Sequence, residues 1–432
     1  MGSQIYYLKN KDEIILEFEL VKEKIIQGKE VGKKFKCQNI IYHKNLLPKA
    51  ISIYGMNLDA WLESRKAPSG RENIEKILNS NNIDTEEFIN ISLCLSLNDT
   101  FWVCPKNAQL SWSDINLYSN SFNKNIALLA IGANAVLDDN VPSVSPEYTT
   151  NGMLRKCWHK DANGIIELLK GSSSKVQIET GYEVFNEYYL PQIADIFGFN
   201  CLKYDLKLFH NILVSSCKIF TDENIGFVPM RYCIHKDVNR TTFTKNQIAS
   251  ISQTIMGEDS FADMMVFDGI IMNQDRHLFN FGMLVDNNTG EFLKPAPIFD
   301  NGFSIFNLIK KHAELEKTDE FKSINSLEAL IESGKTKTSY FDITFDEQVL
   351  LFVKKRHIEG LEKLKTFSFT KHSTFNLVDE ELKLVELSIN KRSEYLCRLL
   401  KDVLLDCETL QSNTQQQKFR INPKTGRREP VE

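Results

Sequence analysis

The sequence lacks paired cysteines and long uninterrupted apolar runs. Its nine cysteines are scattered singly along 432 residues, without a Cys-x2-Cys pair or histidines at metal-ligand spacing, which disfavours both a zinc site and a disulfide framework. The longest apolar stretch, from Ile126 to Leu137, is interrupted by glycine and asparagine and is shorter than the about 20 apolar residues that span a bilayer. No apolar leader follows Met1. These absences predict a reduced, cytoplasmic chain without membrane contact.

The chain also lacks an excess of positive charge. Lysine and arginine together number 52 and aspartate and glutamate 57, for a formal net charge of −5. No overall basic field therefore favours nucleic acid as the main ligand, and we expect no direct nucleic-acid binding. With 42% hydrophobic and 25% charged residues, the composition is that of an ordinary globular protein, long enough for two or three domains and a cleft.

Two polar clusters flanked by apolar sequence carry the clearest functional signal. Asp275 and Asn280 are five residues apart, and Asp300 follows in the segment Pro-Ile-Phe-Asp-Asn-Gly-Phe. In phosphoryl transfer, a carboxylate orients the attacking hydroxyl and accepts its proton, while an amide oxygen and a second carboxylate hold Mg²⁺ at the phosphates. The pattern predicts Asp275 as the catalytic base and Asn280 and Asp300 as metal ligands. A turn is the plainer alternative, because Asp-Asn-Gly is a good turn signal, but it does not explain both clusters together.

A lysine and a glutamate upstream match the other half of such a site. Lys170 ends a predicted strand that begins at Ile165, and Glu187 lies in a segment of helical periodicity that stops at Gly198. A strand lysine held by a helix glutamate grips nucleotide phosphates in kinases. Considered alone, a solvated lysine and a surface glutamate would be the simpler interpretation. Pro191 in the middle of the helical segment costs about 3 kcal/mol unless the helix kinks or begins late.

Two other segments are candidates for nucleotide contact. A small-residue turn, whose backbone amides would cover phosphates, contains Thr149, Thr150, Asn151, Gly152 and Met153. It has one glycine and no Walker motif, so a hairpin turn is the plainer interpretation. The segment with Met230 and Tyr232 is predicted to be an extended crossover that presents backbone N–H and C=O groups to adenine, although a simple linker would look the same.

Taken in order, these motifs resemble the HipA-like serine/threonine kinases of bacterial toxin–antitoxin systems. The resemblance covers about residues 148 to 400 and rests on Thr149-x2-Gly152-x3-Lys156, Leu169-Lys170, Asn186-Glu-Tyr-Tyr189, Asn273-x-Asp275-x-His277-x2-Asn280 and Phe299-Asp300. It implies ATP and Mg²⁺ as cofactors and a protein substrate with a serine or threonine hydroxyl. It also implies a toxin role and an antitoxin partner.

The resemblance assigns a role to each matching residue. It implies the catalytic base Asp275, the metal ligands Asn280 and Asp300, the phosphate-binding lysine Lys170, its helix partner Glu187, and structural support of the catalytic loop by His277. Some family members phosphorylate a serine in their own phosphate loop. Thr149 stands at that position with Thr150 beside it, so both are candidate autophosphorylation sites.

The expected fold class is α+β, a two-lobed protein-kinase-like fold with a mostly helical C-terminal lobe, preceded by a small mixed α/β domain. The polar, proline-containing run at 138–147 indicates the first boundary. The predicted domains are an accessory domain at 1–140, a kinase N-lobe at 141–232, a helical C-lobe at 233–408 and a disordered basic tail at 409–432. Thr344-x2-Glu347 predicts a capping box opening a helix to about Lys365, and the last long helix is expected from about Asp379.

Two other functions remain open at this stage. The Asp275-Arg276-His277-x2-Asn280 string also resembles the loop of phosphoinositide-kinase-like lipid kinases. No basic membrane-facing cluster precedes it, and Asn186-Glu-Tyr-Tyr189 favours the HipA-like family. An inactive kinase fold that acts as a nucleotide-binding regulator is the second alternative, although the sequence lacks none of the required polar residues.

Overall fold

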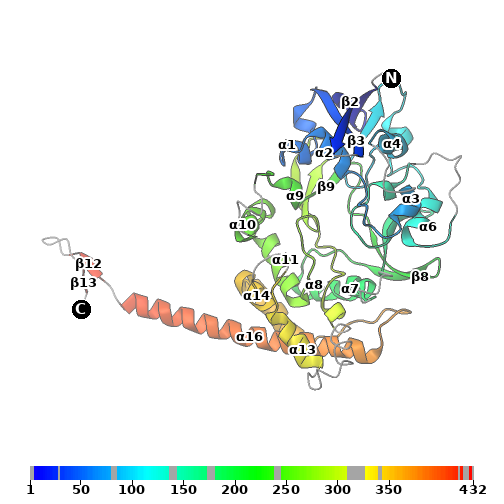
Figure 1. Cartoon of the computed structure of the whole chain (residues 1–432). Helices are drawn as coiled ribbons and strands as arrows, with labels where there is room; N and C mark the ends of the chain where they lie inside the picture. Colours follow the sequence, from blue (N-terminus) through cyan, green and yellow to red (C-terminus); the bar gives the residue numbers. More distant parts are fainter. Residues whose placement is uncertain are drawn as a thin grey trace.

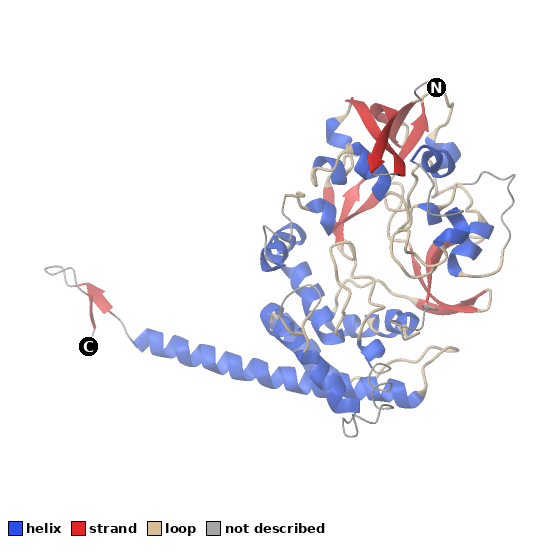
Figure 2. Cartoon of the chain, in the orientation of Figure 1, coloured by secondary structure: helices blue, strands red, loops and turns tan. Residues whose placement is uncertain are grey.

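Antiparallel sheets and helices make up a mixed α/β chain (Figures 1 and 2). The computed structural model describes residues 4–27, 30–78, 85–135, 144–172, 181–237, 245–308, 326–338, 343–416, 419–421 and 428–430. Within these ranges no helix is both long enough and apolar enough to cross a membrane. The expected mixture of strands and helices is confirmed.

The first sheet has the strand order β3-β2-β1-β4. In β1 (Ile5–Asn10), buried side chains such as Tyr6 and Leu8 alternate with partly exposed ones, as in a strand with one covered face. The other strands are β2 (Glu13–Gln27), β3 (Glu30–Ile41) and β4 (Phe101–Pro105).

Short helices lie on both sides of β4 in the chain. α2 (Leu58–Ser64) begins after Asn57, whose side-chain oxygen accepts a hydrogen bond from the Ala60 amide at 3.0 Å and caps the helix. The others are α1 (Lys49–Ser52), α3 (Ile74–Leu78), α4 (Thr85–Ser92), α5 (Trp112–Ile115) and α6 (Lys124–Ile131), with 3₁₀ turns at Lys44–Leu46 and Pro146–Tyr148.

The second sheet has the order β5-β6-β8-β7. Its strands are β5 (Lys156–Lys160), β6 (Ile166–Gly171), β7 (Asp205–Phe209) and β8 (Ile212–Lys218). Lys156 lies directly opposite Lys170 in the antiparallel register of β5 and β6, which places both side chains on one face of the sheet. The predicted strand ending in Lys170 is confirmed.

Two helices replace the single helix predicted around Glu187. α7 (Glu183–Tyr189) ends before Pro191, which is the first residue of α8 (Pro191–Phe197). Proline is tolerated at this first helical position, where its missing N–H has no helical partner. Gly198 ends α8 in a left-handed conformation, with φ of 69°, as the predicted stop requires.

The third sheet, β11-β10-β9, precedes a largely helical region. Its strands are β9 (Ile225–Pro229), β10 (Gly282–Asp286) and β11 (Phe292–Pro295). The helices of this part are α9 (Met230–Cys233), α10 (Lys245–Met256), α11 (Glu258–Ile271), α13 (Ser326–Glu332), α14 (Phe345–Phe352), α15 (Lys355–Leu364) and α16 (Asp379–Gln416), with a 3₁₀ turn at Ser333–Lys335.

The capping box at Thr344 is confirmed, but the helix it begins is shorter than predicted. Thr344 Oγ1 accepts from the Glu347 amide at 3.1 Å, and the Glu347 carboxylate accepts from the Thr344 amide at 2.7 Å. α14 ends at Phe352, and α15 starts after Lys354, whose amide donates to His357 Nδ1 at 3.0 Å. A second helix start interrupts the predicted continuous helix.

The C-terminal helix begins at Asp379, as predicted, and projects away from the rest of the chain (Figure 1). It continues to Gln416, and beyond it β12 (Phe419–Ile421) pairs with β13 (Arg428–Pro430). The disorder expected from residue 409 stays a prediction of the sequence.

The apolar core does not stop at the predicted domain boundary. Residues 136–143, where that boundary falls, lie outside the described residues. One apolar cluster nevertheless contains Leu62 and Ala130 from before the boundary and Cys157, Leu169 and Val214 from the second sheet. Because a domain is expected to have its own core, residues before and after the boundary form one packed unit in this region.

Candidate functional site

A cavity of about 620 Å³ contains most of the predicted site residues. Its volume is within the range typical of ligand sites. The predicted residues that line it are Thr150, Asn151, Gly152, Met153, Lys170, Tyr232, Asp275, His277, Asn280 and Asp300. Thr149, Glu187 and Met230 do not line it. The structure thus brings residues from five separate parts of the chain around one cavity.

Lys170 forms a buried triad with two carboxylates. Its Nζ lies 2.6 Å from Glu187 Oε1 and 2.8 Å from Asp300 Oδ1. Burial alone would lower the pKa of Lys170, but Asp300 and Glu187 together raise it well above its usual value. Burial also raises the pKa of Glu187, against the opposing effect of Lys170. The ammonium, held by two acceptors on the cavity wall, is a charged group in a fixed position.

Asp300 occupies an uncommon backbone conformation between these groups, with φ of 60°. The next amide, that of Asn301, donates to Glu187 Oε2 at 3.2 Å. Burial would raise the pKa of Asp300, but Lys170 and Lys156 overcome this effect and hold it well below its usual range. A left-handed aspartate costs about 1–3 kcal/mol. Lys170 fixes its carboxylate at the cavity, and Glu187 fixes the backbone that follows it.

Lys156 is a second cation in the cavity. Its place in the sequence, at the end of the phosphate loop, did not predict this role. It lines the cavity beside Lys170, and its residue exposure is only 8%. Burial lowers the pKa of Lys156 to about 8. Two ammonium groups directly opposite each other on one sheet face repel, so an anion in the cavity would relieve their repulsion.

Asp275 stands at the mouth of the cavity on a loop with internal hydrogen bonds. Its amide donates to Asn273 Oδ1 at 3.0 Å, and its carbonyl accepts from Asn280 Nδ2 at 2.8 Å. Desolvation raises the pKa of the Asp275 carboxyl; nearby Asp300 adds to the rise and His277 opposes it. The loop therefore presents the Asp275 carboxylate, and the hydrogen bond from the Asn280 side chain to the Asp275 carbonyl joins its two ends.

Arg276, rather than His277, connects this loop to the core. The guanidinium is 2% exposed, and its Nε and Nη2 donate to the two oxygens of Asp268 at 2.8 and 3.0 Å. It also donates to the Asn280 carbonyl at 2.8 Å and to Asn301 Oδ1 at 2.9 Å. His277, the predicted support, has a side chain 46% exposed and accepts only locally, from the Phe279 amide at 3.2 Å. A signal for this contact is present in the sequence: Arg276 follows Asp268 by eight residues, and Asp268 lies in a largely apolar helical segment.

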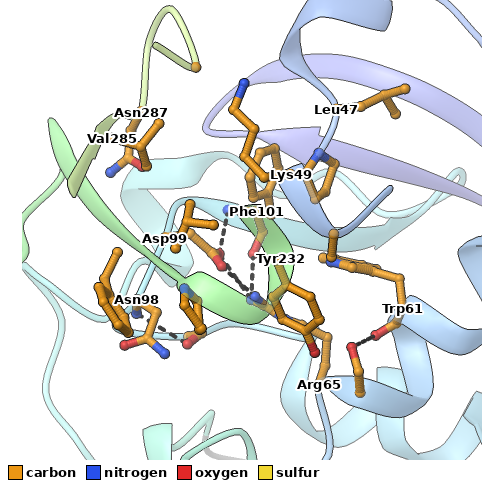
Figure 3. A pocket seen from close by; sticks show the side chains of 18 of the residues that line it. Leu47, Lys49, Trp61, Arg65, Asn98, Asp99, Phe101, Tyr232, Val285 and Asn287 are labelled. Atoms are coloured by element: carbon orange, nitrogen blue, oxygen red, sulfur yellow. Dashed lines mark hydrogen bonds and ion pairs between the residues drawn. The ribbon is translucent and has the colours of Figure 1, made fainter. Parts of the chain in front are cut away.

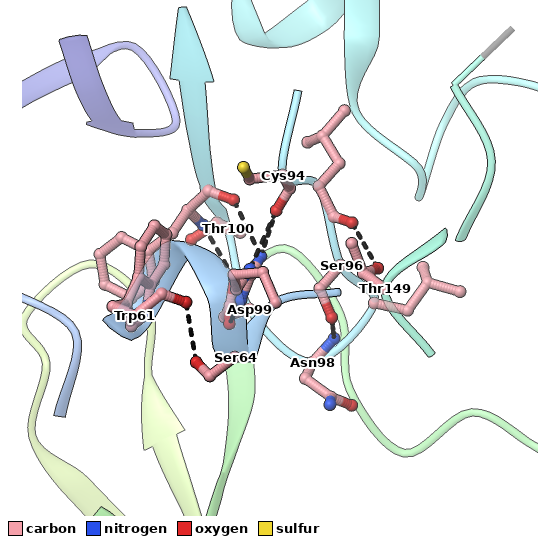
Figure 4. A network of polar contacts seen from close by, with 12 residues as sticks. Trp61, Ser64, Cys94, Ser96, Asn98, Asp99, Thr100 and Thr149 are labelled. Atoms are coloured by element: carbon pink, nitrogen blue, oxygen red, sulfur yellow. Dashed lines mark hydrogen bonds and ion pairs between the residues drawn. The ribbon is translucent and has the colours of Figure 1, made fainter. Parts of the chain in front are cut away.

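The phosphate-loop threonines are hydrogen-bonded within the protein. Thr149 Oγ1 donates to the Leu95 carbonyl at 2.6 Å (Figure 4). Thr150 Oγ1 donates to the Pro146 carbonyl at 2.6 Å and accepts from Trp158 Nε1 at 2.9 Å. Neither hydroxyl is therefore free to accept a phosphoryl group in this conformation.

The predicted extended crossover at Met230 is wrong. Met230 begins the short helix α9, is fully buried, and donates its amide to the Phe281 carbonyl at 2.8 Å. This amide is not available to an adenine, because it donates to the Phe281 carbonyl at the end where the pairing of β9 with β10 stops. Tyr232 does line the cavity, through its side chain.

A smaller cavity of about 120 Å³ adjoins the first, and Tyr232 lines both (Figure 3). Its other walls include Leu47, Trp61 and Phe101 from the N-terminal region and Val285 from β10. Lys170, Asp275 and Asp300 line only the larger cavity, so the larger one is the candidate active site.

Comparisons with known proteins find similar solved structures. No family model matches the chain, and no relative is found among curated proteins. The structure is similar to the proinflammatory kinase CtkA of Helicobacter pylori, with 17% identity and a TM-score of 0.45 over 59% of this chain and 94% of that one. It is also similar to HipA of Shewanella oneidensis MR-1, solved with HipB and operator DNA, with 12% identity and a TM-score of 0.46 over 92% of this chain and 99% of that one. At these identities and scores, neither likeness assigns an activity.

Proposed function

We propose that this chain is an ATP- and Mg²⁺-dependent protein serine/threonine kinase of HipA-like type. The observation that carries the proposal is that Lys170, paired with Glu187 and Asp300, faces the same cavity as Asp275 and Asn280. These are the groups that phosphoryl transfer requires. We infer a two-lobed arrangement, with the sheet of β5 to β8 on one side of the nucleotide and the helices from α10 onward on the other.

Each residue has a distinct task in this proposal. Lys170 binds the α- and β-phosphates, and Glu187 keeps its ammonium in position. Asp275 orients the acceptor hydroxyl toward the γ-phosphorus and accepts its proton.

Asn280 and Asp300 fit the part of magnesium ligands. Asn280 Nδ2 is engaged by the Asp275 carbonyl, which leaves Oδ1 as the atom that faces a cation. Mg²⁺ in nucleotide sites takes one or two carboxylates and completes its shell with phosphate and water, so a single amide oxygen and a single carboxylate are a fitting set. When bound, the ion neutralises charge on the triphosphate.

The intact mass of the purified protein, before and after incubation with Mg-ATP, tests the proposal. We expect a gain equal to one phosphate that fragment mapping assigns to Thr149 or Thr150. Because both hydroxyls are hydrogen-bonded within the protein, the loop must leave its place to react, and the gain should be slow. The Asp275→Asn variant should show no gain.

Other outcomes would separate the alternatives. Transfer from labelled ATP to phosphoinositide vesicles but not to proteins would favour a lipid kinase. Binding of Mg-ATP without transfer to any protein or lipid offered would favour a nucleotide-binding regulator. A wild-type protein that binds no Mg-ATP would refute the kinase proposal. The toxin role and the antitoxin partner stay predictions of the sequence resemblance.

The affinity for Mg-ATP should fall as pH rises, because Lys156 loses its proton. Its pKa of about 8 means that the ammonium is present below pH 8 and is lost above it, so phosphate binding is favoured on the acid side. Above that pKa we expect the dissociation constant to rise by up to about tenfold per pH unit. Calorimetric titrations at pH 7, 8 and 9 measure it.

Lys156→Met is the matched control for this pH dependence. The variant should bind Mg-ATP more weakly than the wild type at pH 7 and should show little change between pH 7 and 9. An equal pH dependence in both proteins would show that another group is responsible.

A further inference from the structure

The segment 67–72, between α2 and α3, forms hydrogen bonds with main-chain carbonyls of the phosphate loop. The loop, residues 147–156, runs from the 3₁₀ turn at Pro146–Tyr148 to the start of β5. Within segment 67–72, the Ala67 amide donates to the Tyr148 carbonyl at 2.8 Å, and the Glu72 amide donates to the Met153 carbonyl at 3.0 Å. Two main-chain carbonyls of the loop are thus directed toward the N-terminal region.

Arg71 binds three more carbonyls of the same loop. Its Nη1 donates to the carbonyls of Glu147 at 3.1 Å and Thr150 at 3.2 Å, and its Nη2 donates to the carbonyl of Lys156. One guanidinium therefore joins the beginning, the middle and the end of the loop. Together with the two amides of the segment, five carbonyls within ten residues point to the same side.

Arg71 is buried, which makes its placement informative. The residue is 2% exposed, and its Nε has no hydrogen-bond partner in the described part of the chain. A buried charge is costly unless it is paired. The hydrogen bonds of Arg71 go to carbonyl oxygens, and the buried Glu147 carboxylate acts on it electrostatically. An apolar side chain here would leave the three carbonyls without these donors, so the placement of the loop depends on the guanidinium.

The direction of the carbonyls matters for anion binding. Carbonyl oxygens carry partial negative charge and repel phosphate, whereas consecutive amides attract it. Loop residues 150–154 and Lys156 line the cavity, while the carbonyls of Thr150, Met153 and Lys156 are engaged by the segment on the other side. Engaging these oxygens on the other side keeps their partial negative charge away from a phosphate in the cavity, and Lys156 remains as the cation that the loop presents there.

We propose that Arg71 is a positioning residue for nucleotide binding, which gives the N-terminal region a part in the active site. It acts through the loop: it holds the carbonyls of Glu147, Thr150 and Lys156 turned from the cavity, so that these oxygens do not repel the triphosphate. This inference rests on the proposed kinase function, since it concerns the binding of the same phosphates.

Arg71→Met removes the donors and keeps a long side chain, and Arg65→Met is the matched control. Arg65 is a second buried arginine of the N-terminal region, 9% exposed, which pairs with Asp99 (Figure 3) and donates to the Cys94 carbonyl. Among the described residues, its hydrogen bonds do not reach the loop. Both variants lose buried hydrogen bonds, so both should be less stable than the wild type. Loss of stability alone therefore does not distinguish them.

The dissociation constant for Mg-ATP and the hydrogen exchange of loop amides do distinguish them. In Arg71→Met we expect about tenfold weaker binding, the effect of losing charged hydrogen bonds, and faster exchange of residues 147–156 even without nucleotide. In Arg65→Met, the dissociation constant for Mg-ATP and the exchange rates of the loop amides should match those of the wild type. Arg71→Lys, which keeps the charge, serves if the methionine variant does not fold, and it should bind with intermediate affinity.

Each outcome decides between the two proposals. A wild type that binds Mg-ATP beside an Arg71 variant that binds equally well would overturn the positioning role and leave the kinase proposal standing. Equal weakening in the Arg65 variant would overturn it as well, because the effect would then follow from stability. A wild type that binds no Mg-ATP would overturn both.

Discussion

Replacing Asp275 by asparagine is expected to lower kcat for phosphoryl transfer about 10²–10⁴-fold, the contribution typical of a general base. The amide has the shape of the carboxylate but does not accept a proton from the acceptor hydroxyl. Since the backbone at this position is held through Asn273 and Asn280, the loop should keep its conformation. The affinity for Mg-ATP should change little, because Lys170 lies elsewhere on the cavity wall.

The measurement is steady-state transfer from labelled ATP to a protein acceptor, with Mg-ATP affinity determined separately. His277→Gln is the control: its ring lies 3.9 Å from Asp275 Oδ1 and is half exposed, so its loss should reduce kcat far less. Since desolvation raises the pKa of Asp275, the base is ionised only above that raised value, and kcat should increase with pH through it. Retention of kcat in Asp275→Asn would refute the role of base.

The parts of the site that the sequence predicts well are those with local patterns. A strand followed by a helix, with Lys170 and Glu187 at their facing positions, needs only the two hydrophobic periodicities and a short connection. Their 2.6 Å contact follows from packing that helix on that strand. The capping box at Thr344 is equally local, because its partners are three residues apart.

The parts that the sequence misses depend on contacts between distant segments. Arg71 meets the loop some 80 residues later in the chain, and nothing in its neighbourhood distinguishes it from a surface arginine. Lys156 becomes functional only because the strand register sets it opposite Lys170. The conformation at Met230 was mispredicted for the same reason: its amide donates to the carbonyl of Phe281, which lies just before β10 and far along the chain.

The left-handed backbone conformation of Asp300 could not be predicted from the sequence pattern either. Asp300 itself is the left-handed residue of its segment. Its conformation is tolerated because Lys170 holds the carboxylate and Glu187 accepts the next amide. Strain at one residue is thus balanced by an ion pair and a hydrogen bond to residues more than 100 positions away in the sequence, and both partners belong to the proposed site.

Removing Asp268 should be among the most destabilising single changes in the chain. Asp268→Ala leaves the Arg276 guanidinium buried without its carboxylate partner, both side chains being 2% exposed or less. Loss of one partner of a buried ion pair costs about 3–5 kcal/mol in the free energy of unfolding. Urea denaturation followed by tryptophan fluorescence measures the change.

The matched control is Asp195→Ala, which breaks the pair of Asp195 with Lys203 at the surface, where the two side chains are 49% and 69% exposed. Solvent screening limits that cost to less than about 1 kcal/mol. The buried pair should also matter for activity, because Arg276 donates to the Asn280 carbonyl and to Asn301, on either side of the cavity. Equal costs for the two variants would mean that Arg276 finds other partners, and that the loop bearing Asp275 is held by its own hydrogen bonds alone.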